Sequence, residues 1–259
     1  MVVLLLVGAL LAVHAVLTIL GTEAQDAAIG QWGFMPGRLT IALWPERLSD
    51  LLTRAGRDPA ALGQTILIRH YGVLNGGAKI WTLATYALLH GSWTHVIVNC
   101  IWLVAFGPPA ARRFGAIRFL LFFVATAVAG ALAQWAYAPL DFTPLIGASA
   151  ADSGLMAAAA RFMFLPGAAL GTLRDVNAGL SGDANAAPAA GLREVLGDRR
   201  VLIFIAIWMA TNFLFGAGAQ TLGASEAPVA WIAHVGGFVA GLLIFPMFDR
   251  TAQAALGRN

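Results

Sequence analysis

The sequence predicts an all-α membrane protein, a bundle of six transmembrane helices with a long external first loop. Of the 259 residues, 59% are hydrophobic and only 11% are charged, whereas an average soluble domain is roughly 25% charged. The mean hydropathy is +0.76. Six segments come near the ~20 apolar residues that a helix needs to cross a bilayer. We expect them to form a single membrane domain over residues 1–259.

The expected spans cover residues 2–20, 94–110, 116–138, 148–164, 201–215 and 228–248. The first segment also has features of a signal peptide. A signal peptide, however, has a basic start and an apolar run of roughly 7 to 15 residues. This segment lacks the basic start and its run is longer, so we expect it to be retained as a span.

The basic residues indicate the orientation of the bundle. With six spans, the termini and two loops share one side, and that side carries ten of the 16 basic residues. The other six lie in the long connection after the first span, where the positive-inside rule acts weakly. We therefore expect cytoplasmic termini, with Trp93, Trp135 and Trp231 near the external ends of their spans. Fifteen Arg against one Lys is typical of a GC-rich genome, which suggests a bacterial inner membrane.

Two connections are long enough to describe. Residues 21–93 form the expected external first loop, in which Asp58 and Pro59 are placed as N-cap and first residue of a short amphipathic helix. The upstream stretch WPERLSDLLTR has the same pattern, and we expect both helices to lie on the membrane surface. Residues 166–199, rich in Gly and Ala, are expected to be a mobile cytoplasmic loop.

Several function classes have no support in the sequence. The net charge of +3 is not gathered into one block, so we expect no nucleic-acid binding. The single cysteine, Cys100, cannot form an internal disulfide and is expected to be a small core residue. Motifs such as CxxC and HExxH do not occur, so we expect no metal and no other cofactor.

Nine polar residues within the predicted spans are functional candidates, because burying a polar group in hydrocarbon is costly. They are His14, His95, Asn99, Ser149, Asp152, Ser153, Thr211, Asn212 and His234. His95 and Asn99 lie four apart in HVIVN, on one helical face. Ser149 follows TPLIGA, where Pro144 and Gly147 prevent a regular helix, so the fourth span is expected to start there with unpaired N–H groups. Taken alone, Ser149 is expected to be a simple N-cap.

The last span contains a histidine followed by regularly spaced glycines. His234 lies in AHVGGFVAGLL, with Gly237 and Gly241 three and seven residues later, on nearly one helical face. Small residues four apart let two membrane helices approach closely. Such an approach would allow His234 to hydrogen-bond with a serine on another helix.

Together these residues fit the requirements of acyl transfer. A serine hydroxyl becomes a good nucleophile when a neighbouring base accepts its proton, and neutral imidazole is the usual base near pH 7. The oxyanion of the tetrahedral intermediate needs hydrogen-bond donors. Ser149 and His234 fit the roles of nucleophile and base. His95, Asn99 and the free N–H groups at the helix start fit the oxyanion site.

At these motifs the chain resembles the rhomboid family of intramembrane serine proteases, from about Trp81 to Phe248. HVIVN matches H-x-x-x-N on the family's second helix, and GAS matches G-x-S at the start of its fourth. AHVGGFVAG matches A-H-x-x-G-x-x-x-G on its sixth. Each motif alone is weak, but their order on three different spans is specific.

The resemblance implies a six-helix bundle with a water-accessible cavity that opens externally. It makes Ser149 the nucleophile and His234 the general base, with the Ser149 amide, His95 and Asn99 at the oxyanion site. Members of the family cut other membrane proteins in or near their transmembrane segments, without ATP or a metal. The implied partners are therefore transmembrane protein substrates and the lipid bilayer itself.

The sequence departs from the family pattern around the nucleophile and in the first loop. Rhomboids usually follow the serine with Gly, where this chain has Ala150. The extra methyl group could crowd the oxyanion region, or it could cost little if the backbone stays helical there. An aromatic residue often lies four after the serine, beneath the histidine, where this chain has Ser153. In the first loop, many rhomboids have Trp-Arg where this chain has Trp81 and Thr82. Without the arginine, the loop must be anchored in another way.

Asp152 is a further departure, since an apolar residue is usual there and a buried charge needs a partner or water. One interpretation is that Asp152 adjusts the reactivity of His234 or Ser149. It lies three residues after Ser149, within reach of the same helical face. The simpler interpretation is a carboxyl group that is hydrated in the cavity, hydrogen-bonded to another span, or protonated.

Two alternatives to an active protease remain. Ala150 and Ser153 are compatible with a rhomboid-like pseudoprotease that binds transmembrane helices without cleaving them. His95 and His234 within the membrane are compatible with a small transporter, but the chain has no detectable inverted repeat or matched pair of interrupted helices.

Overall fold

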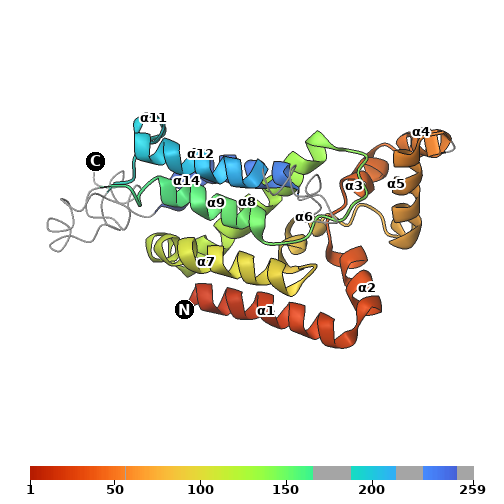
Figure 1. Ribbon diagram of the computed structural model, residues 1–259, viewed down its shortest axis with the longest axis horizontal. Helices are drawn as coiled ribbons and strands as arrows, with labels where there is room; N and C mark the ends of the chain where they lie inside the picture. Colours follow the sequence, from red (N-terminus) through yellow and green to blue (C-terminus); the bar gives the residue numbers. More distant parts are fainter. Residues whose placement is uncertain (56, 166–187, 214–229, 250–259) are drawn as a thin grey trace.

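The computed structural model describes residues 1–55, 57–165, 188–213 and 230–249 as a helical bundle (Figure 1). No β-strand occurs in these ranges, only an isolated bridge between Phe34 and Leu145. The helices are α1 (Val2–Leu20), α2 (Thr22–Trp32), α3 (Pro36–Leu43), α4 (Glu46–Ala55), α5 (Pro59–His70), η1 (Val73–Asn75), α6 (Thr82–Thr85), η2 (Tyr86–Leu88), α7 (Trp93–Phe114), α8 (Ala116–Tyr137), α9 (Ser149–Ala160), α11 (Leu192–Gly197), α12 (Arg199–Phe213) and α14 (Trp231–Phe248). The prediction of an all-α protein is confirmed.

Four of the described helices are long and apolar enough to cross a membrane, namely α1, α7, α8 and α14. Their bounds agree with the predicted spans to within a few residues. The predicted span 148–164 is too long, because the helix ends at Ala160 and residues 161–165 form turns. Arg161 fixes this end, since its backbone carbonyl accepts from the Ala190 N–H at 2.8 Å and its Nε donates to the Ala190 carbonyl at 2.7 Å. Of the spans 201–215 and 228–248, residues 214–215 and 228–229 lie outside the described ranges.

Helix α9 is the centre of the bundle and packs against α7, α8 and α14. Every residue from Ala150 to Ala160 is buried. A helix that is apolar on all sides is expected in such a position. Its side chains are mostly Ala, Gly and Ser, so the surrounding helices can lie close to its backbone.

A buried ion pair joins α7 and α14 at the end of the bundle where α1 begins (Figure 1). The guanidinium of Arg113 donates to both carboxylate oxygens of Asp249, from Nε at 3.0 Å and from Nη2 at 2.8 Å. Both side chains are almost completely buried, and the rings of Phe162 and Phe245 lie over the guanidinium. Two parallel hydrogen bonds are the strongest geometry for such a pair.

The connection between α1 and α7 is itself a small helical layer beyond the opposite end of the bundle, at the right of Figure 1. Its helices share a second hydrophobic core, formed by Met35, Leu51, Ala61, Ile68, Val73 and Phe142. Helix α5 begins at Pro59 as the sequence predicts, and the carboxylate of Asp58 accepts from the Ala60 N–H at 2.9 Å. Helix α4 lies in the predicted WPERLSDLLTR stretch, whereas α2 and α3 are additional.

The end of α2 anchors this layer to the segment before α7. The last carbonyl groups of a helix have no partner within it, and here side chains of the α6 region bond to them. Trp81 Nε1 donates to the Gln31 carbonyl at 3.1 Å, and Thr85 Oγ1 donates to the Trp32 carbonyl at 2.8 Å. Thr82, which replaces the family's arginine, is buried and donates to the Lys79 carbonyl at 2.7 Å. The layer is therefore anchored without that arginine.

The connection 166–199, expected to be a mobile loop, contains a short helix among its described residues. Residues 166–187 lie outside the described ranges, but α11 covers Leu192–Gly197. Its first turn is closed by Glu194, whose carboxylate accepts from the Gly191 N–H at 2.6 Å, and Val195 is buried against the bundle.

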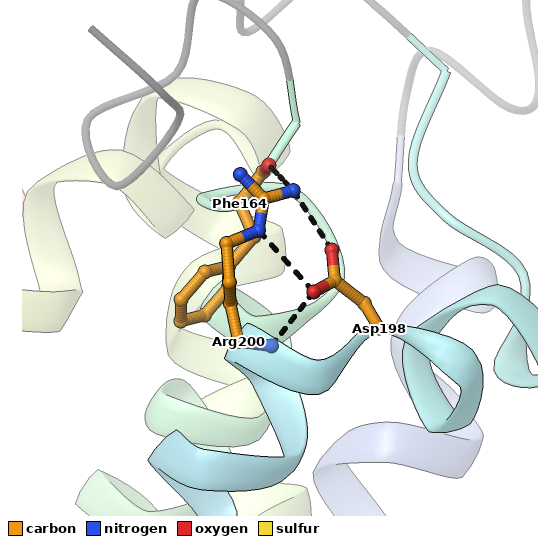
Figure 2. Close-up of polar contacts among 3 residues, drawn as sticks. All are labelled: Phe164, Asp198 and Arg200. Carbon is orange, nitrogen blue, oxygen red and sulfur yellow. Dashed lines mark hydrogen bonds and ion pairs between the residues drawn. The ribbon is translucent and has the colours of Figure 1, made fainter.

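Figure 2 shows how the start of α12 is fixed. The carboxylate of Asp198 accepts from the Arg200 N–H and Nη2, both at 2.8 Å, and Arg200 Nη2 also donates to the Phe164 carbonyl at 3.0 Å. The side-chain hydrogen bond from Arg200 lowers the pKa of the Asp198 carboxyl group from its ordinary value. This contact joins α12 to the segment that follows α9.

We predict that Asp249→Ala lowers the free energy of unfolding by about 3 to 5 kcal/mol, because it leaves the Arg113 guanidinium buried without its carboxylate. Asp198→Ala is the control, since its ion pair is partly exposed and its loss should cost about 1 kcal/mol. Thermal unfolding of both variants in detergent measures the difference. Equal effects would contradict the structural importance of the buried pair.

Candidate active site

The serine of GAS and the histidine of AHVGG meet at one end of the central helix. Ser149 is the first residue of α9, and His234 lies in the first turn of α14. Ser149 Oγ is 2.6 Å from His234 Nε2, within hydrogen-bond distance. Ser149 is not the simple N-cap that it would be if taken alone, because Ala148 occupies the N-cap position and the serine hydroxyl reaches α14.

The backbone that enters α9 follows a path that only glycine takes easily. Gly147 has φ +113°, in the region that side chains strain. Its N–H donates to the Tyr86 carbonyl at 3.0 Å, and the Ala148 N–H donates to His90 Nε2 at 3.4 Å. A Cβ at Gly147 would lie 2.6 Å from His95 Nε2. The residues just before Ser149 are thus held against the start of α7.

The predicted oxyanion residues lie beside this backbone. A Cβ placed on Gly147 would lie next to side-chain nitrogens of both residues. It would be 2.6 Å from His95 Nε2 and 3.6 Å from Asn99 Nδ2. Asn99 is buried, and its Nδ2 donates to the His95 carbonyl at 3.0 Å. The N–H of Ser149 has no partner within α9, because the first four N–H groups of a helix lack one. The side-chain nitrogens of His95 and Asn99 and the N–H of Ser149 therefore lie around the entrance to α9.

Close contact between α9 and α14 brings the serine and the histidine together. A Cβ at Gly237 would overlap the Ala150 carbonyl oxygen, and a Cβ at Gly241 would lie 2.5 Å from the Gly154 carbonyl oxygen. Both glycines of AHVGGFVAG thus face the backbone of α9. Any larger residue at either position would push the two helices apart.

The methyl group of Ala150 points away from the oxyanion donors. It lies against α8, where a Cβ at Gly130 would be only 2.6 Å from the Ala150 Cβ. Ala150 itself is 1% exposed. The expected crowding of the oxyanion region by this methyl group is therefore not found, because Gly130 leaves room for it.

The other two departures near Ser149, Asp152 and Ser153, have different surroundings. Asp152 is buried, and neither of its carboxylate oxygens has a hydrogen-bond partner among the described residues. The carboxylate oxygens therefore make no hydrogen bond to His234 or to another described helix, and burial without such a bond favours the uncharged carboxyl group. Ser153 is also buried, and its hydroxyl donates to the Ser149 carbonyl at 2.7 Å.

Asn212, on α12, contacts the second ring nitrogen of His234. Its Oδ1 is hydrogen-bonded with His234 Nδ1, and its Nδ2 donates to the Trp208 carbonyl at 2.9 Å. Asn212 is one of the nine polar residues in the predicted spans, but the sequence assigns it no role. Its intramembrane position was the available signal, and only the packing of α12 on α14 reveals its partner.

Among the described residues, no group of three or more His, Cys, Asp or Glu side chains is arranged to hold a metal ion. The remaining histidines near the site pack on one another instead. The rings of His90 and His95 meet edge to face at 5.0 Å, and His14 Nδ1 lies 3.1 Å from the His90 carbonyl. These contacts join α1 to the start of α7.

The sequence model of the rhomboid domain matches residues 77–250, about two thirds of the chain. The chain belongs to the rhomboid family. All three motifs discussed above lie within the matched range, and the rhomboid architecture makes this a multi-pass membrane protein. The matched range begins in the segment that carries Trp81 and ends directly after α14.

Three bacterial proteins are similar to this rhomboid over shorter stretches. The putative rhomboid protease YdcA of Bacillus subtilis is 35% identical over 91 residues, which are 35% of this chain and 44% of YdcA. The rhomboid protease GluP of the same organism is 33% identical over 78 residues, 30% of this chain and 15% of GluP. The rhomboid protease GlpG of Haemophilus influenzae is 30% identical over 66 residues, 25% of this chain and 34% of GlpG. In each case the similarity spans less than half of the relative.

We predict that Gly237→Ala destabilises this rhomboid by about 3 kcal/mol, because the new methyl group meets a backbone carbonyl that cannot move without shifting α9. Gly8→Ala in α1 is the matched control, since a Cβ there would meet nothing within 4 Å. Ala is also the better helix former, so Gly8→Ala should be neutral or slightly stabilising. Thermal unfolding in detergent compares the two, and a Gly237→Ala protein as stable as wild type would contradict the close contact.

Proposed function

We propose that this protein is an intramembrane serine protease that hydrolyses peptide bonds in or near the transmembrane segments of other membrane proteins. The observation that carries the proposal is the 2.6 Å separation between Ser149 Oγ and His234 Nε2 at the start of the central helix. Membership of the rhomboid family supports it, and so do three relatives that are named as rhomboid proteases or a putative one.

In the proposed reaction, His234 Nε2 accepts the proton of the Ser149 hydroxyl while Oγ attacks the carbonyl carbon of the scissile bond. The resulting imidazolium then gives this proton to the leaving amine, so that the C–N bond breaks and an ester on Ser149 remains. A water molecule, deprotonated by the same imidazole, hydrolyses the ester and releases the second product. Atoms and charges balance without a cofactor or a metal, and the proposal includes neither.

The proposed oxyanion site consists of the Ser149 N–H and the side chains of His95 and Asn99. Donors held in place before the reaction stabilise the developing negative charge without having to reorganise. The left-handed backbone at Gly147 supports this arrangement, because it allows the chain to pass directly beside both side chains. A substrate carbonyl placed over Ser149 would face these donors.

At the level of the fold, we propose six spans, formed by α1, α7, α8, α9, α12 and α14, in a single domain over residues 1–259. Residues 21–93 would form the external first loop and residues 166–199 a cytoplasmic connection. Both termini would be cytoplasmic, in the inner membrane of a bacterium. The proposed partners are transmembrane protein substrates within the lipid bilayer, and no nucleic acid.

The pseudoprotease alternative is less well supported than an active enzyme. It depended on Ala150 and Ser153, and neither side chain obstructs the serine. The Ala150 methyl group lies against Gly130, and Ser153 bonds the Ser149 carbonyl rather than its hydroxyl. The intramembrane His234 that suggested a transporter lies within hydrogen-bond distance of a serine, which fits hydrolysis better than transport.

We predict that a fluorophosphonate probe labels the purified protein in detergent and that Ser149→Ala abolishes the labelling. His234→Ala should lower the labelling rate by about 1,000-fold or more, because the hydroxyl loses its base. Labelling that survives in Ser149→Ala would contradict the proposal.

A second prediction concerns cleavage of a generic type I membrane protein in liposomes. Wild type should cut it, and Asn99→Ala should lower kcat by about 100- to 1,000-fold through loss of an oxyanion donor. Ala150→Gly tests the pseudoprotease alternative. If Ala150→Gly cleaves while wild type does not, the natural protein is a pseudoprotease and the proposed function is wrong.

A further inference from the structure

We infer that Asn212 is a positioning residue that fixes His234 in the tautomer able to act as a base towards Ser149. This inference rests on the proposed function and adds a third member to the serine and the histidine. It concerns α12, on which neither of the two predicted catalytic residues lies. The contacts of one side-chain amide carry it.

The two ends of the Asn212 amide can be assigned from their partners. An amide has a donor NH₂ group and an acceptor oxygen, whereas a backbone carbonyl only accepts. The end of the amide that lies 2.9 Å from the Trp208 carbonyl must therefore be the NH₂ group. This leaves Oδ1 facing His234 Nδ1. Because Oδ1 only accepts, Nδ1 must carry the hydrogen.

The tautomer of His234 follows directly. A neutral imidazole has one N–H group and one bare nitrogen. With the hydrogen on Nδ1, the bare nitrogen is Nε2, which lies 2.6 Å from Ser149 Oγ. The opposite tautomer would set two acceptors against each other at Asn212 and would leave no base beside the serine. Asn212 thus stabilises the reactive tautomer, and it also bonds the imidazolium that forms after proton transfer.

Packing one helical turn deeper holds Asn212 in place. Trp208 and Phe238 lie four residues from Asn212 and His234, on α12 and α14 respectively, and their rings stack at 4.2 Å with an interplanar angle of 21°. Both rings are almost completely buried. The Trp208 carbonyl that receives the Asn212 amide belongs to the same residue, so the stacked pair fixes both the helix and the direction of the amide.

The other polar side chains near the nucleophile do not take this role. The Asp152 oxygens have no hydrogen-bond partner among the described residues, and the Ser153 hydroxyl is bonded to the Ser149 carbonyl. Within the described part of the chain, Asn212 is the side chain bonded to His234 Nδ1. Its role is that of the aspartate in a Ser-His-Asp triad, filled here by a neutral acceptor.

The test compares four proteins in detergent and in liposomes: wild type, Asn212→Leu, Asn212→Asp and Thr211→Ala. Asn212→Leu keeps a similar volume but removes the acceptor, whereas Asn212→Asp keeps an acceptor oxygen. Thr211→Ala is the matched control, because Thr211 is exposed and its Oγ1 likewise donates to the carbonyl four residues earlier, that of Ile207, at 2.8 Å. Asn212→Ala replaces the leucine variant if that variant does not fold.

We predict that Asn212→Leu slows fluorophosphonate labelling of Ser149 and lowers kcat for the liposome substrate by about 10- to 100-fold. KM and the melting temperature should stay close to wild type, because the substrate-binding surface and the Trp208–Phe238 stack remain. Asn212→Asp should recover part of the lost rate, and Thr211→Ala should behave as wild type.

Three results would overturn the inference while leaving the proposed protease intact. The first is labelling of Asn212→Leu at the wild-type rate. The second is an equal loss of rate in Asn212→Asp and Asn212→Leu. The third is a loss of rate in Asn212→Leu that a lower melting temperature or a higher KM explains. If wild type labels no faster than Ser149→Ala, the proposed function itself fails and the inference falls with it. The Ser149→Ala comparison therefore separates the two failures.

Discussion

The contact between the backbones of α9 and α14 is the constraint on which the candidate site depends. A side chain at Gly237 or Gly241 would have no room between these helices, because the carbonyl groups of Ala150 and Gly154 occupy the positions where its Cβ would lie. In a membrane, helices gain little from burying apolar surface against each other and depend on such close packing. The 2.6 Å separation of Ser149 Oγ and His234 Nε2 requires this spacing.

The start of α9, which carries the proposed nucleophile Ser149, is held from three directions. The start of α7 supplies His95 beside Gly147, and the residues before it supply the Tyr86 carbonyl and the His90 ring. The first-loop layer holds the approaching segment through the paired backbones of Phe34 and Leu145. A catalytic group needs this kind of support, because small errors in position cost large factors in rate.

The departures from the family pattern have local explanations in the packing. The methyl group of Ala150 is accommodated because Gly130 on α8 has no side chain. Thr82 bonds locally while Trp81 and Thr85 bond the end of α2. Asp152 keeps an acidic side chain in a buried position, where its oxygens have no hydrogen-bond partner among the described residues and the uncharged form avoids the cost of an unpaired charge.

The sequence alone determined the helical class, the positions of the four long apolar helices and the residues expected at the site, because hydropathy, helical spacing and short motifs are local properties. It also placed the start of α5 at Pro59, where Asp58 caps the helix as expected. It paired Ser149 with His234 but could not determine how closely their side chains approach, that α9 ends at Ala160, or that the Ala150 methyl group faces Gly130. Nor did it identify Asn212 as the partner of His234. These depend on which helices are neighbours and at what height, and only the tertiary packing of residues far apart in the chain decides that.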